Sequence, residues 1–453
     1  MLADIISSIV RFGGRPYEVG GYVRDSLLGL QAKDLDIEVF GLSADSLYEL
    51  LSEFGQVNRV GVSFGVMKLN MADGTEVDFT LPRRETKCGP GHKGFDVELD
   101  PSMTISIAAA RRDYTINAIY RCAASGALDD PYKGLVDLRG RCLRATSSQF
   151  AEDPLRVLRG MQFAARFNLV ADQRTTELCL SLRGEYPTLA IERIWNEWLK
   201  WATRGAVPSK GLRFLAETDW LTLYPQLEAL RGCPQDPQWH PEGDVWIHTL
   251  HVCDAAAQIA ARDHLGSDER AILLFAALCH DLGKATTTAF VDGHWRAHGH
   301  CEAGVELSRQ FLSSIGCPEA IIEFVEPLVA EHLVHARQEI TARSVRRLAS
   351  RLSPASIEQL IRLIEADMGG RPPLPPGLPS TVQVLAEMAQ ELQVEQGQPA
   401  PLILGRHLLA LGKQPGPWFG PVLAACFEAQ LDGHFNSEGE GVEYLKDLLN
   451  RHG

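Results

Sequence analysis

The sequence predicts an α+β fold, with a mixed sheet and helices in the N-terminal third and helices alone in the rest of the chain. Within the first eighty residues, short runs rich in β-branched residues alternate with helical patterns, and glycine turns separate them. From about residue 146 onward the recognisable segments are helical. A chain of 453 residues exceeds one hydrophobic core, so we expect two to four compact units.

Composition narrows the class of protein. Hydrophobic residues make up 45% of the chain, and no apolar run approaches the ~20 residues that span a bilayer, so we expect no membrane partner. The first residues, MLADIISSIVRF, lack the basic start and cleavage site of a signal peptide. Ten cysteines without CxxC pairs are typical of reduced thiols, which predicts a cytoplasmic protein.

The formal net charge of −14 argues against a general nucleic-acid coat, because phosphate contacts need lysine and arginine. Arginines nevertheless cluster along the chain, and each cluster is either a local RNA contact or a solvated helix face. The clusters are Arg139, Arg141 and Arg144; Arg156, Arg159 and Arg166; and Arg343, Arg346, Arg347 and Arg351.

A glycine turn near the N-terminus has the features of a phosphate site. Gly20 and Gly21 follow a short β-prone segment and precede an apolar run, Val23 to Leu28, that suits a helix. Such a turn exposes backbone N–H groups beside a helix N-terminus, and both attract phosphate.

Three aspartates nearby predict a magnesium site. Asp34 and Asp36 alternate along a second predicted strand, so their carboxylates project side by side and need a cation, for which oxygen ligands favour Mg²⁺. Asp78 lies in a predicted hairpin that would join the same sheet. Two-metal phosphoryl transfer uses such a cluster. The alternative is a surface strand and hairpin with solvated carboxylates.

Together, Gly-Gly-x-Val-Arg-Asp-x-Leu-Leu-Gly and the following Asp-x-Asp resemble the signature of the DNA polymerase β superfamily, specifically the tRNA nucleotidyltransferase and poly(A) polymerase family. A second family motif, Arg-Arg-Asp-x-Thr-x-Asn-Ala, begins at Arg111. The resemblance implies a catalytic head over residues 1–145. It also implies that the ribose and triphosphate contact the glycine turn and the arginine motif, through Gly20, Gly21, Arg24, Arg112, Asp113 and Asn117.

A helical neck is expected over residues 146–230, with Glu-Asp-x-x-Arg near its start. By resemblance, Asp153 and Arg156, with Arg159 nearby, act as an amino-acid template on one helix. An aspartate accepts a hydrogen bond from the exocyclic amine of cytosine or adenine, and a guanidinium donates to the adjacent ring position. Before the neck, the glycine-rich stretch 82–107 is expected to be an irregular loop, as in relatives.

A second motif set resembles the HD phosphohydrolase domain, over residues 231–371. His248, the adjacent pair His280 and Asp281, and Asp367 can furnish nitrogen and oxygen ligands for a divalent metal, Ni²⁺, Mn²⁺ or Mg²⁺. His298, His300 and His332 are weaker candidates for further ligands or phosphate contacts. Taken singly, each histidine is more often a packed residue.

These patterns predict an enzyme that adds CCA to the 3′ end of tRNA from CTP and ATP with Mg²⁺, with phosphatase or 2′,3′-cyclic phosphodiesterase activity at the HD motif. A helical tail, residues 380–453, is expected to contact the tRNA body, and no DNA partner is expected. One alternative is an A-adding enzyme or poly(A) polymerase with the same head. Another is an RNA-binding protein with only HD phosphohydrolase activity.

Overall fold

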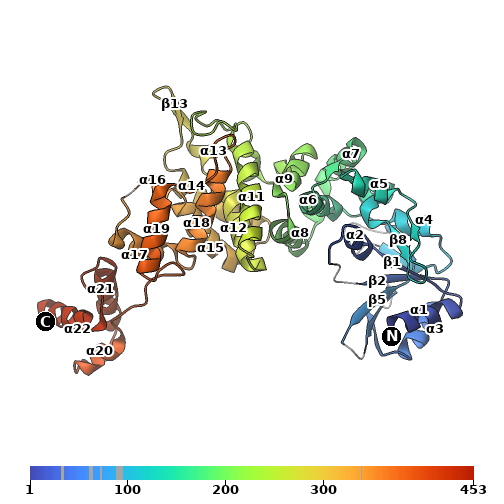
Figure 1. The fold of residues 1–453 in the computed structure, drawn as a ribbon, viewed down its shortest axis with the longest axis horizontal. Coiled ribbons are helices and arrows are strands. Elements are labelled where there is room, and N and C mark those ends of the chain that lie inside the picture. Colours follow the sequence, from blue (N-terminus) through green and yellow to red (C-terminus); the bar gives the residue numbers. More distant parts are fainter. Residues whose placement is uncertain (32–34, 61–64, 72–73, 88–94, 338, 453) are drawn as a thin grey trace. The chain divides into compact units, whose positions relative to one another are not determined.

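The computed structural model describes the whole chain apart from residues 32–34, 61–64, 72–73, 88–94, 338 and 453. It divides into two compact units, Met1–Leu221 and Thr222–Gly453. The first unit contains a seven-stranded sheet with helices, and the second is helical apart from one small hairpin in the described residues (Figure 1). The predicted α+β fold class is confirmed, and the finer subdivision of the chain stays a prediction.

The sheet of the first unit has the strand order β3-β4-β5-β2-β1-β8-β9. Strands β2 and β5 are parallel, and the other neighbouring strands are antiparallel. The strands are β1 (Arg15–Val19), β2 (Asp36–Phe40), β3 (Gln56–Val60), β4 (Val66–Asn70), β5 (Glu76–Thr80), β8 (Tyr120–Cys122) and β9 (Leu128–Asp129).

One face of this sheet packs on helices α1 (Leu2–Arg11) and α3 (Ala44–Ser52). Ile37 and Val39 of β2 belong to that core, together with apolar residues from both helices. Because side chains alternate along a strand, Asp36 and Glu38 face the opposite side, where Glu38 meets Arg111 and Arg112. The alternation therefore buries one set of β2 residues and directs its carboxylates toward the site described below.

The remainder of the first unit is mainly helical. Helix α6 packs against both α8 and α9. Gly160 of α6 allows the close approach of α9, because a Cβ there would lie 2.8 Å from the ring of Phe214. The helices are α2 (Gly21–Leu27), α4 (Ile105–Ala110), α5 (Gly134–Arg139), α6 (Leu155–Phe167), α7 (Gln173–Ser181), α8 (Ile191–Arg204) and α9 (Pro208–Glu217), and β10 (Cys142–Leu143) pairs with β11 (Val170–Ala171).

Two local predictions are wrong. The stretch 82–107 was expected to be irregular, but β6 (Arg83–Lys87) and β7 (Phe95–Leu99) form an antiparallel pair in it, and residues 88–94 lie outside the described part. The alternation in Phe-Asp-Val-Glu-Leu is a strand pattern that the glycines obscured. Asp153 was placed on the helix with Arg156, yet it lies in extended backbone just before α6.

The second unit is built around α11, α12 and α18, which pack on one another. None of its described helices, nor any in the first unit, is both long and apolar enough to cross a bilayer. The elements are α10 (Pro225–Glu228), α11 (Val245–Arg262), α12 (Ser267–Cys279), α13 (Lys284–Thr287), β12 (Ala289–Val291), β13 (His294–Arg296), α14 (His300–Ser314), α15 (Glu319–Glu331), α16 (Val334–Arg337), α17 (Ala342–Leu352), α18 (Ile357–Gly369), α19 (Ser380–Glu391), α20 (Gly405–Ala410), α21 (Phe419–Leu431) and α22 (Glu438–His452).

The third arginine cluster connects helices within this unit. Arg343 and Arg347 of α17 both pair with Asp432, which follows α21, and Arg351 pairs with Glu331. Their charges are largely neutralised by these carboxylates, so this cluster gives little support to a local RNA contact.

All nine cysteines in the described residues are free thiols.

Candidate functional sites

A cavity of about 440 Å³ in the first unit collects the nucleotide motifs of the sequence. Ten of the twelve residues predicted for the head and its template helix line it: Gly20, Gly21, Arg24, Asp36, Arg112, Asp113, Asn117, Asp153, Arg156 and Arg159. Asp78 is not a lining residue, and Asp34 lies outside the described residues. Motifs separated by more than a hundred residues in sequence therefore meet at one site.

The glycine turn forms one wall of this cavity. Gly20 has a positive φ of 68°, which favours glycine, and α2 begins at the next residue. Arg24 on this helix is buried, pairs with Asp25, and donates a hydrogen bond to the side-chain oxygen of Asn117. Its guanidinium also lies over the ring of Phe167, 4.5 Å from the ring centroid. Arg24 thus connects the turn to the second nucleotide motif.

Two of the three predicted catalytic carboxylates are neighbours in the sheet. Asp36 of β2 lies opposite Asp78 of β5 in the parallel register. Asp78 Oδ1 is buried, has no hydrogen-bond partner among the described residues, and lies 3.4 Å from the ammonium of Lys68. A buried carboxylate oxygen with spare capacity, beside a second carboxylate, is a donor set that fits Mg²⁺.

Glu38 is a functional candidate that the sequence interpretation missed. It is fully buried, and its two carboxylate oxygens pair with Arg111 at 3.1 Å and Arg112 at 3.0 Å. The Tyr120 hydroxyl donates a further hydrogen bond to it. Burial opposes ionisation, but the guanidiniums of Arg112 and Arg111 hold the pKa of Glu38 below its usual value. The continued alternation Asp-x-Asp-x-Glu was the available signal.

Asp113 organises the second motif. It accepts hydrogen bonds from the Asn117 amide and the Tyr114 backbone N–H, and it pairs with Arg159 at 2.7 Å. Burial alone would raise the pKa of Asp113, but Arg159 and these hydrogen bonds outweigh that effect and lower the pKa to about 2. The carboxylate therefore stays ionised and holds Arg159 at the cavity.

The two residues predicted as the template, Asp153 and Arg156, line the cavity and have different partners. Asp153 Oδ2 pairs with Arg193 of α8 at 2.7 Å, and its other oxygen accepts the backbone N–H of Leu155. Arg156 donates to the backbone carbonyls of Gln149 and Arg111, each at 2.7 Å. Each of the two side chains is therefore held at the cavity wall by its own partners, and not by the other.

The cavity is strongly cationic although the chain is acidic. Nine arginines and lysines line it against three aspartates. Such an excess of positive charge at one concave site favours a polyanionic ligand such as a nucleoside triphosphate. The second arginine cluster, Arg156, Arg159 and Arg166, lines this cavity.

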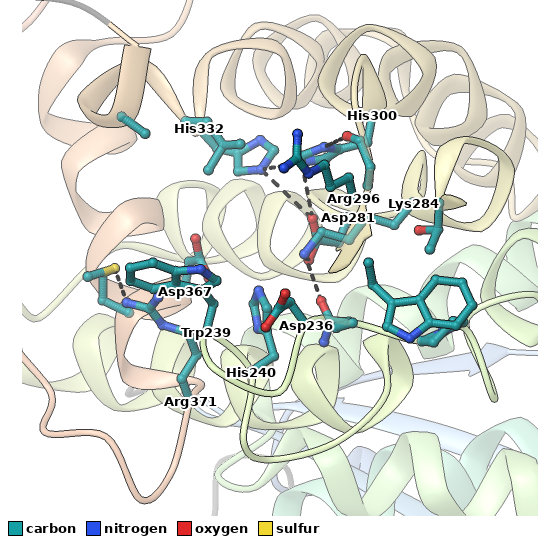
Figure 2. A pocket seen from close by; sticks show the side chains of 18 of the residues that line it. Asp236, Trp239, His240, Asp281, Lys284, Arg296, His300, His332, Asp367 and Arg371 are labelled. Atoms are coloured by element: carbon teal, nitrogen blue, oxygen red, sulfur yellow. Dashed lines mark hydrogen bonds and ion pairs between the residues drawn. The ribbon is translucent and has the colours of Figure 1, made fainter. Parts of the chain in front are cut away.

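A separate cluster of histidines and aspartates lies in the second unit (Figure 2). His248 belongs to α11, His280 and Asp281 follow α12, and Asp367 belongs to α18. All four are less than one-tenth exposed. His248 Nε2 lies 3.1 Å from Asp367 Oδ1 and 3.3 Å from His280 Nε2, and His280 Nε2 lies 3.2 Å from Asp281 Oδ2. The four predicted ligands therefore converge.

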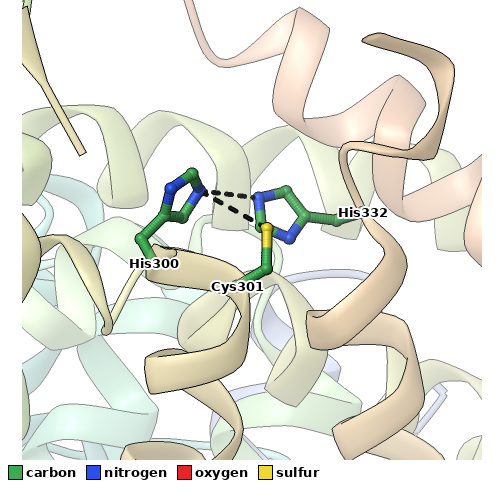
Figure 3. Close-up of side chains that lie close together, drawn as sticks. All are labelled: His300, Cys301 and His332. Carbon is green, nitrogen blue, oxygen red and sulfur yellow. Dashed lines mark hydrogen bonds between the residues drawn. The ribbon is translucent and has the colours of Figure 1, made fainter. Parts of the chain in front are cut away.

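Two of the weaker candidates join the same cluster. His300 Nε2 and His332 Nε2 lie 3.4 Å apart, and both approach the other Asp281 oxygen, Oδ1, at 3.5 and 3.9 Å. Figure 3 shows these two imidazoles beside the Cys301 thiol. His298 is exposed and does not line the cavity. Asp281 thus lies between two pairs of imidazoles.

Contacts of the Nδ1 atoms orient the four imidazole rings of the cluster. The Nδ1 atoms of His280, His300 and His332 each contact a backbone carbonyl three residues earlier, at 2.6 to 2.8 Å. His248 Nδ1 contacts Glu242 Oε1 at 2.8 Å and the backbone carbonyl of Gly370 at 3.3 Å. A proton held on Nδ1 leaves the Nε2 lone pair directed into the cluster, which is the arrangement of histidine metal ligands.

The protonation of the cluster is compatible with a metal ion. Burial lowers the pKa of His332 to about 3 and also lowers that of His300, so both imidazoles are neutral at pH 7. Burial opposes charge on His248, but hydrogen bonds with Asp367 and Glu242 raise its pKa to about 9. A metal ion would compete with that proton. Nitrogen and carboxylate donors together fit a divalent transition metal.

Comparison with known proteins places these two sites in one family. Residues 16–144 match the poly A polymerase head domain, and residues 245–365 match the HD domain. The multifunctional CCA protein of Nitrosococcus oceani is 38% identical over 365 residues, covering 78% of this chain and 84% of that protein. The chain belongs to the multifunctional CCA protein family. The Xanthomonas campestris pv. campestris member is 36% identical over 422 residues, which are 90% of this chain and 96% of that protein. The family resemblance read from the motifs is confirmed.

Solved structures agree with the fold of this family. The CCA-adding enzyme of Bacillus stearothermophilus in complex with CTP has a TM-score of 0.67 and 20% identity, over 100% of this chain and 97% of that chain. The Thermotoga maritima CCA-adding enzyme complexed with tRNA has a TM-score of 0.61 and 18% identity, over 99% and 94%. The matched regions include residues of both units.

Proposed function

We propose that this protein adds CCA to the 3′ end of tRNA, from CTP and ATP, by nucleotidyl transfer without a nucleic-acid template. One observation carries the proposal: the cationic cavity in which Asp36 and both nucleotide motifs meet. The names of the family relatives and of the solved CCA-adding enzymes support the same activity.

In this proposal Asp34 and Asp36 would hold Mg²⁺, with Asp78 assisting. When bound, Mg²⁺ lowers the pKa of the attacking 3′-hydroxyl and neutralises the leaving pyrophosphate. The protein itself binds and orients the nucleotide. Arg112 and the Asp113–Asn117 motif contact ribose and triphosphate, next to the exposed N–H groups of the glycine turn.

Base selection is assigned to Asp153 and Arg156, which lie at the same wall of the cavity. Cytosine and adenine both present an amine donor beside a ring acceptor, which suits a carboxylate and a guanidinium. The carbonyls of Gln149 and Arg111 fix the Arg156 guanidinium, so its position is set before a base enters. Guanine and uracil present the opposite pattern and leave both protein groups unsatisfied.

The test uses purified protein and tRNA that lacks its last three nucleotides, with CTP and ATP offered singly and together. We expect extension by CC with CTP alone and completion to CCA with both. Extension only by ATP would instead identify an A-adding enzyme or poly(A) polymerase. Absence of any extension, with intact hydrolysis at the second site, would favour an RNA-binding phosphohydrolase.

A second activity is proposed for the histidine cluster, where four imidazole nitrogens and two carboxylates converge. His248, His280, Asp281 and Asp367 would hold Ni²⁺, Mn²⁺ or Mg²⁺, with His300 and His332 as further ligands. A bound metal would supply Lewis-acid activation for phosphate ester hydrolysis. Metal analysis of the native protein and a 2′,3′-cyclic phosphate assay test this, and a metal-free native protein would count against it.

The tail remains a proposed contact for the tRNA body. Residues 380–453 contain nine acidic and four basic residues. Contact there would therefore rest on shape and hydrogen bonding more than on charge, since phosphate repels carboxylate. Deletion of this segment should weaken tRNA binding and leave CTP binding unchanged.

A further inference from the structure

We propose that Trp239 and Trp295 form a base-stacking subsite that determines specificity at the histidine cluster of the second unit. The inference rests on the proposed phosphohydrolase activity of that site and adds the residues that choose its substrate. The ligand would be a nucleotide whose phosphate meets the cluster and whose base stacks on indole.

The two indoles border the cavity that contains the cluster. This cavity has a volume of about 490 Å³, within the range of small-molecule sites, and Asp281, His300, His332 and Asp367 line it together with both tryptophans. Trp239 is 59% exposed and Trp295 is 37% exposed. Large aromatic rings left open at the edge of a cavity that contains charged groups are available to a planar ligand, and their exposure is otherwise unfavourable.

Contacts with neighbouring residues hold the segments that carry the two indoles. Trp295 belongs to the β12–β13 hairpin, where it lies opposite Phe290 with ring centroids 5.1 Å apart. His294 of the same hairpin pairs with Asp236 at 2.7 Å. The backbone N–H of Trp239 donates to the carbonyl of Asp236 at 3.1 Å. Asp236 therefore connects the hairpin that carries one indole to the loop that carries the other.

Cationic side chains in the same cavity suit the phosphate of a nucleotide. Lys284, Arg296 and Arg371 line the cavity with the indoles (Figure 2). The Lys284 ammonium lies 2.7 Å from Asp281 Oδ2, and the Arg371 Nε is buried without a hydrogen-bond partner among the described residues. Lys284 thus brings positive charge to a cluster ligand, while the exposed rings offer an apolar surface. A phosphate ester without an aromatic ring would contact only the charged groups and not the indoles.

Substitutions of the full-length, metal-loaded protein test the subsite. A nucleoside 2′-monophosphate and glycerol 2-phosphate serve as substrates with and without a base. For Trp239→Ala and Trp295→Ala we expect KM for the nucleotide to rise about tenfold, which corresponds to the loss of one stacking contact. Values for glycerol phosphate and the bound metal content should not change. Trp295→Phe should restore most of the nucleotide affinity.

Trp418→Ala is the matched control, because Trp418 is 39% exposed, has an aromatic neighbour, and does not line the cavity. Equal losses for both substrates, or no loss for either, would overturn the subsite. If the wild type hydrolyses neither substrate, the proposed hydrolase activity fails. Calorimetric titration with the nucleotide then decides the subsite alone: both alanine variants should lose a binding event that Trp418→Ala retains, and equal binding in all of them would reject it.

Discussion

Asp36 and Asp78 lie directly opposite each other on the two parallel strands of an otherwise antiparallel sheet. The parallel pairing brings together carboxylates 42 positions apart in sequence, and the cavity opens on the Asp36 side. We therefore expect Asp36→Asn to reduce nucleotide addition at least about a hundredfold, a typical loss for a removed electrostatic contact in a transition state. Asp78→Asn should have a smaller effect.

Single-turnover extension of the shortened tRNA measures these losses. Asp45→Asn is the control for a change of charge at the surface, since Asp45 is exposed and pairs only with Arg59 among the ion pairs of the described residues. Full activity of Asp36→Asn would remove the catalytic assignment of the first unit.

The buried carboxylate of Glu38 should contribute to both protein stability and nucleotide affinity. Glu38→Gln leaves Arg111 and Arg112 adjacent without their shared carboxylate, and breaking a buried ion pair costs about 3–5 kcal/mol. We expect a lower free energy of unfolding and a raised KM for both CTP and ATP. Tyr120→Phe removes one hydrogen bond to the same carboxylate and should cost only about 1 kcal/mol.

Asp153 should control which base is added. Asp153→Ala removes the acceptor for the exocyclic amine, so we expect incorporation of UTP or GTP relative to CTP to rise roughly tenfold or more. Arg193→Met removes the ion pair with Asp153 but keeps the carboxylate, and it should lower the rate without changing base choice. Competition assays with paired nucleotides measure both effects. Identical selectivity in wild type and Asp153→Ala would exclude this residue as the template.

Asp113 should make the stability of the protein depend on pH in acid. Its folded-state pKa, about 2, lies below the usual aspartate value of about 3.9. The contribution to stability is therefore complete above about pH 4 and is lost as the pH falls toward 2. Urea unfolding of wild type and Asp113→Asn should show a constant difference from pH 7 to 5 that shrinks below pH 4. A difference that grows in acid would contradict the assignment.

Glu242 should raise the metal affinity of the second unit through His248. Its carboxylate contacts the Nδ1 atoms of both His248, at 2.8 Å, and His240, at 2.9 Å. Removal of such a partner of a metal-binding histidine weakens metal binding by about 10- to 100-fold. Metal content of Glu242→Gln after dialysis against graded chelator measures this. Glu331→Gln, whose carboxylate pairs with Arg351 outside the cavity, should bind metal like the wild type.

The sequence motifs of the first unit, and the family resemblance that they carry, predicted most of the first site. Each motif combines a turn or strand pattern with side chains of one chemistry. The glycine turn, the arginine motif and the Asp153–Arg156 segment all line one cavity. What these patterns omitted was Glu38, because the local alternation indicates only which side of the strand its carboxylate faces. Its two arginine partners lie 73 and 74 positions away in the sequence. The β6–β7 pair is missed for a different reason, because the glycines between its two strands in the sequence favour a loop.

The histidine cluster shows the same division. The resemblance of the motif order to the HD domain predicted His248, His280, Asp281 and Asp367 as a group. The packing of α11, α12 and α18 was needed to show that Asp281 lies between two imidazole pairs. Residue types and short-range spacing are written in the chain and determine which side chains are chemically able to act. Which of them meet depends on strand register and helix packing, because those contacts join segments that no local pattern connects.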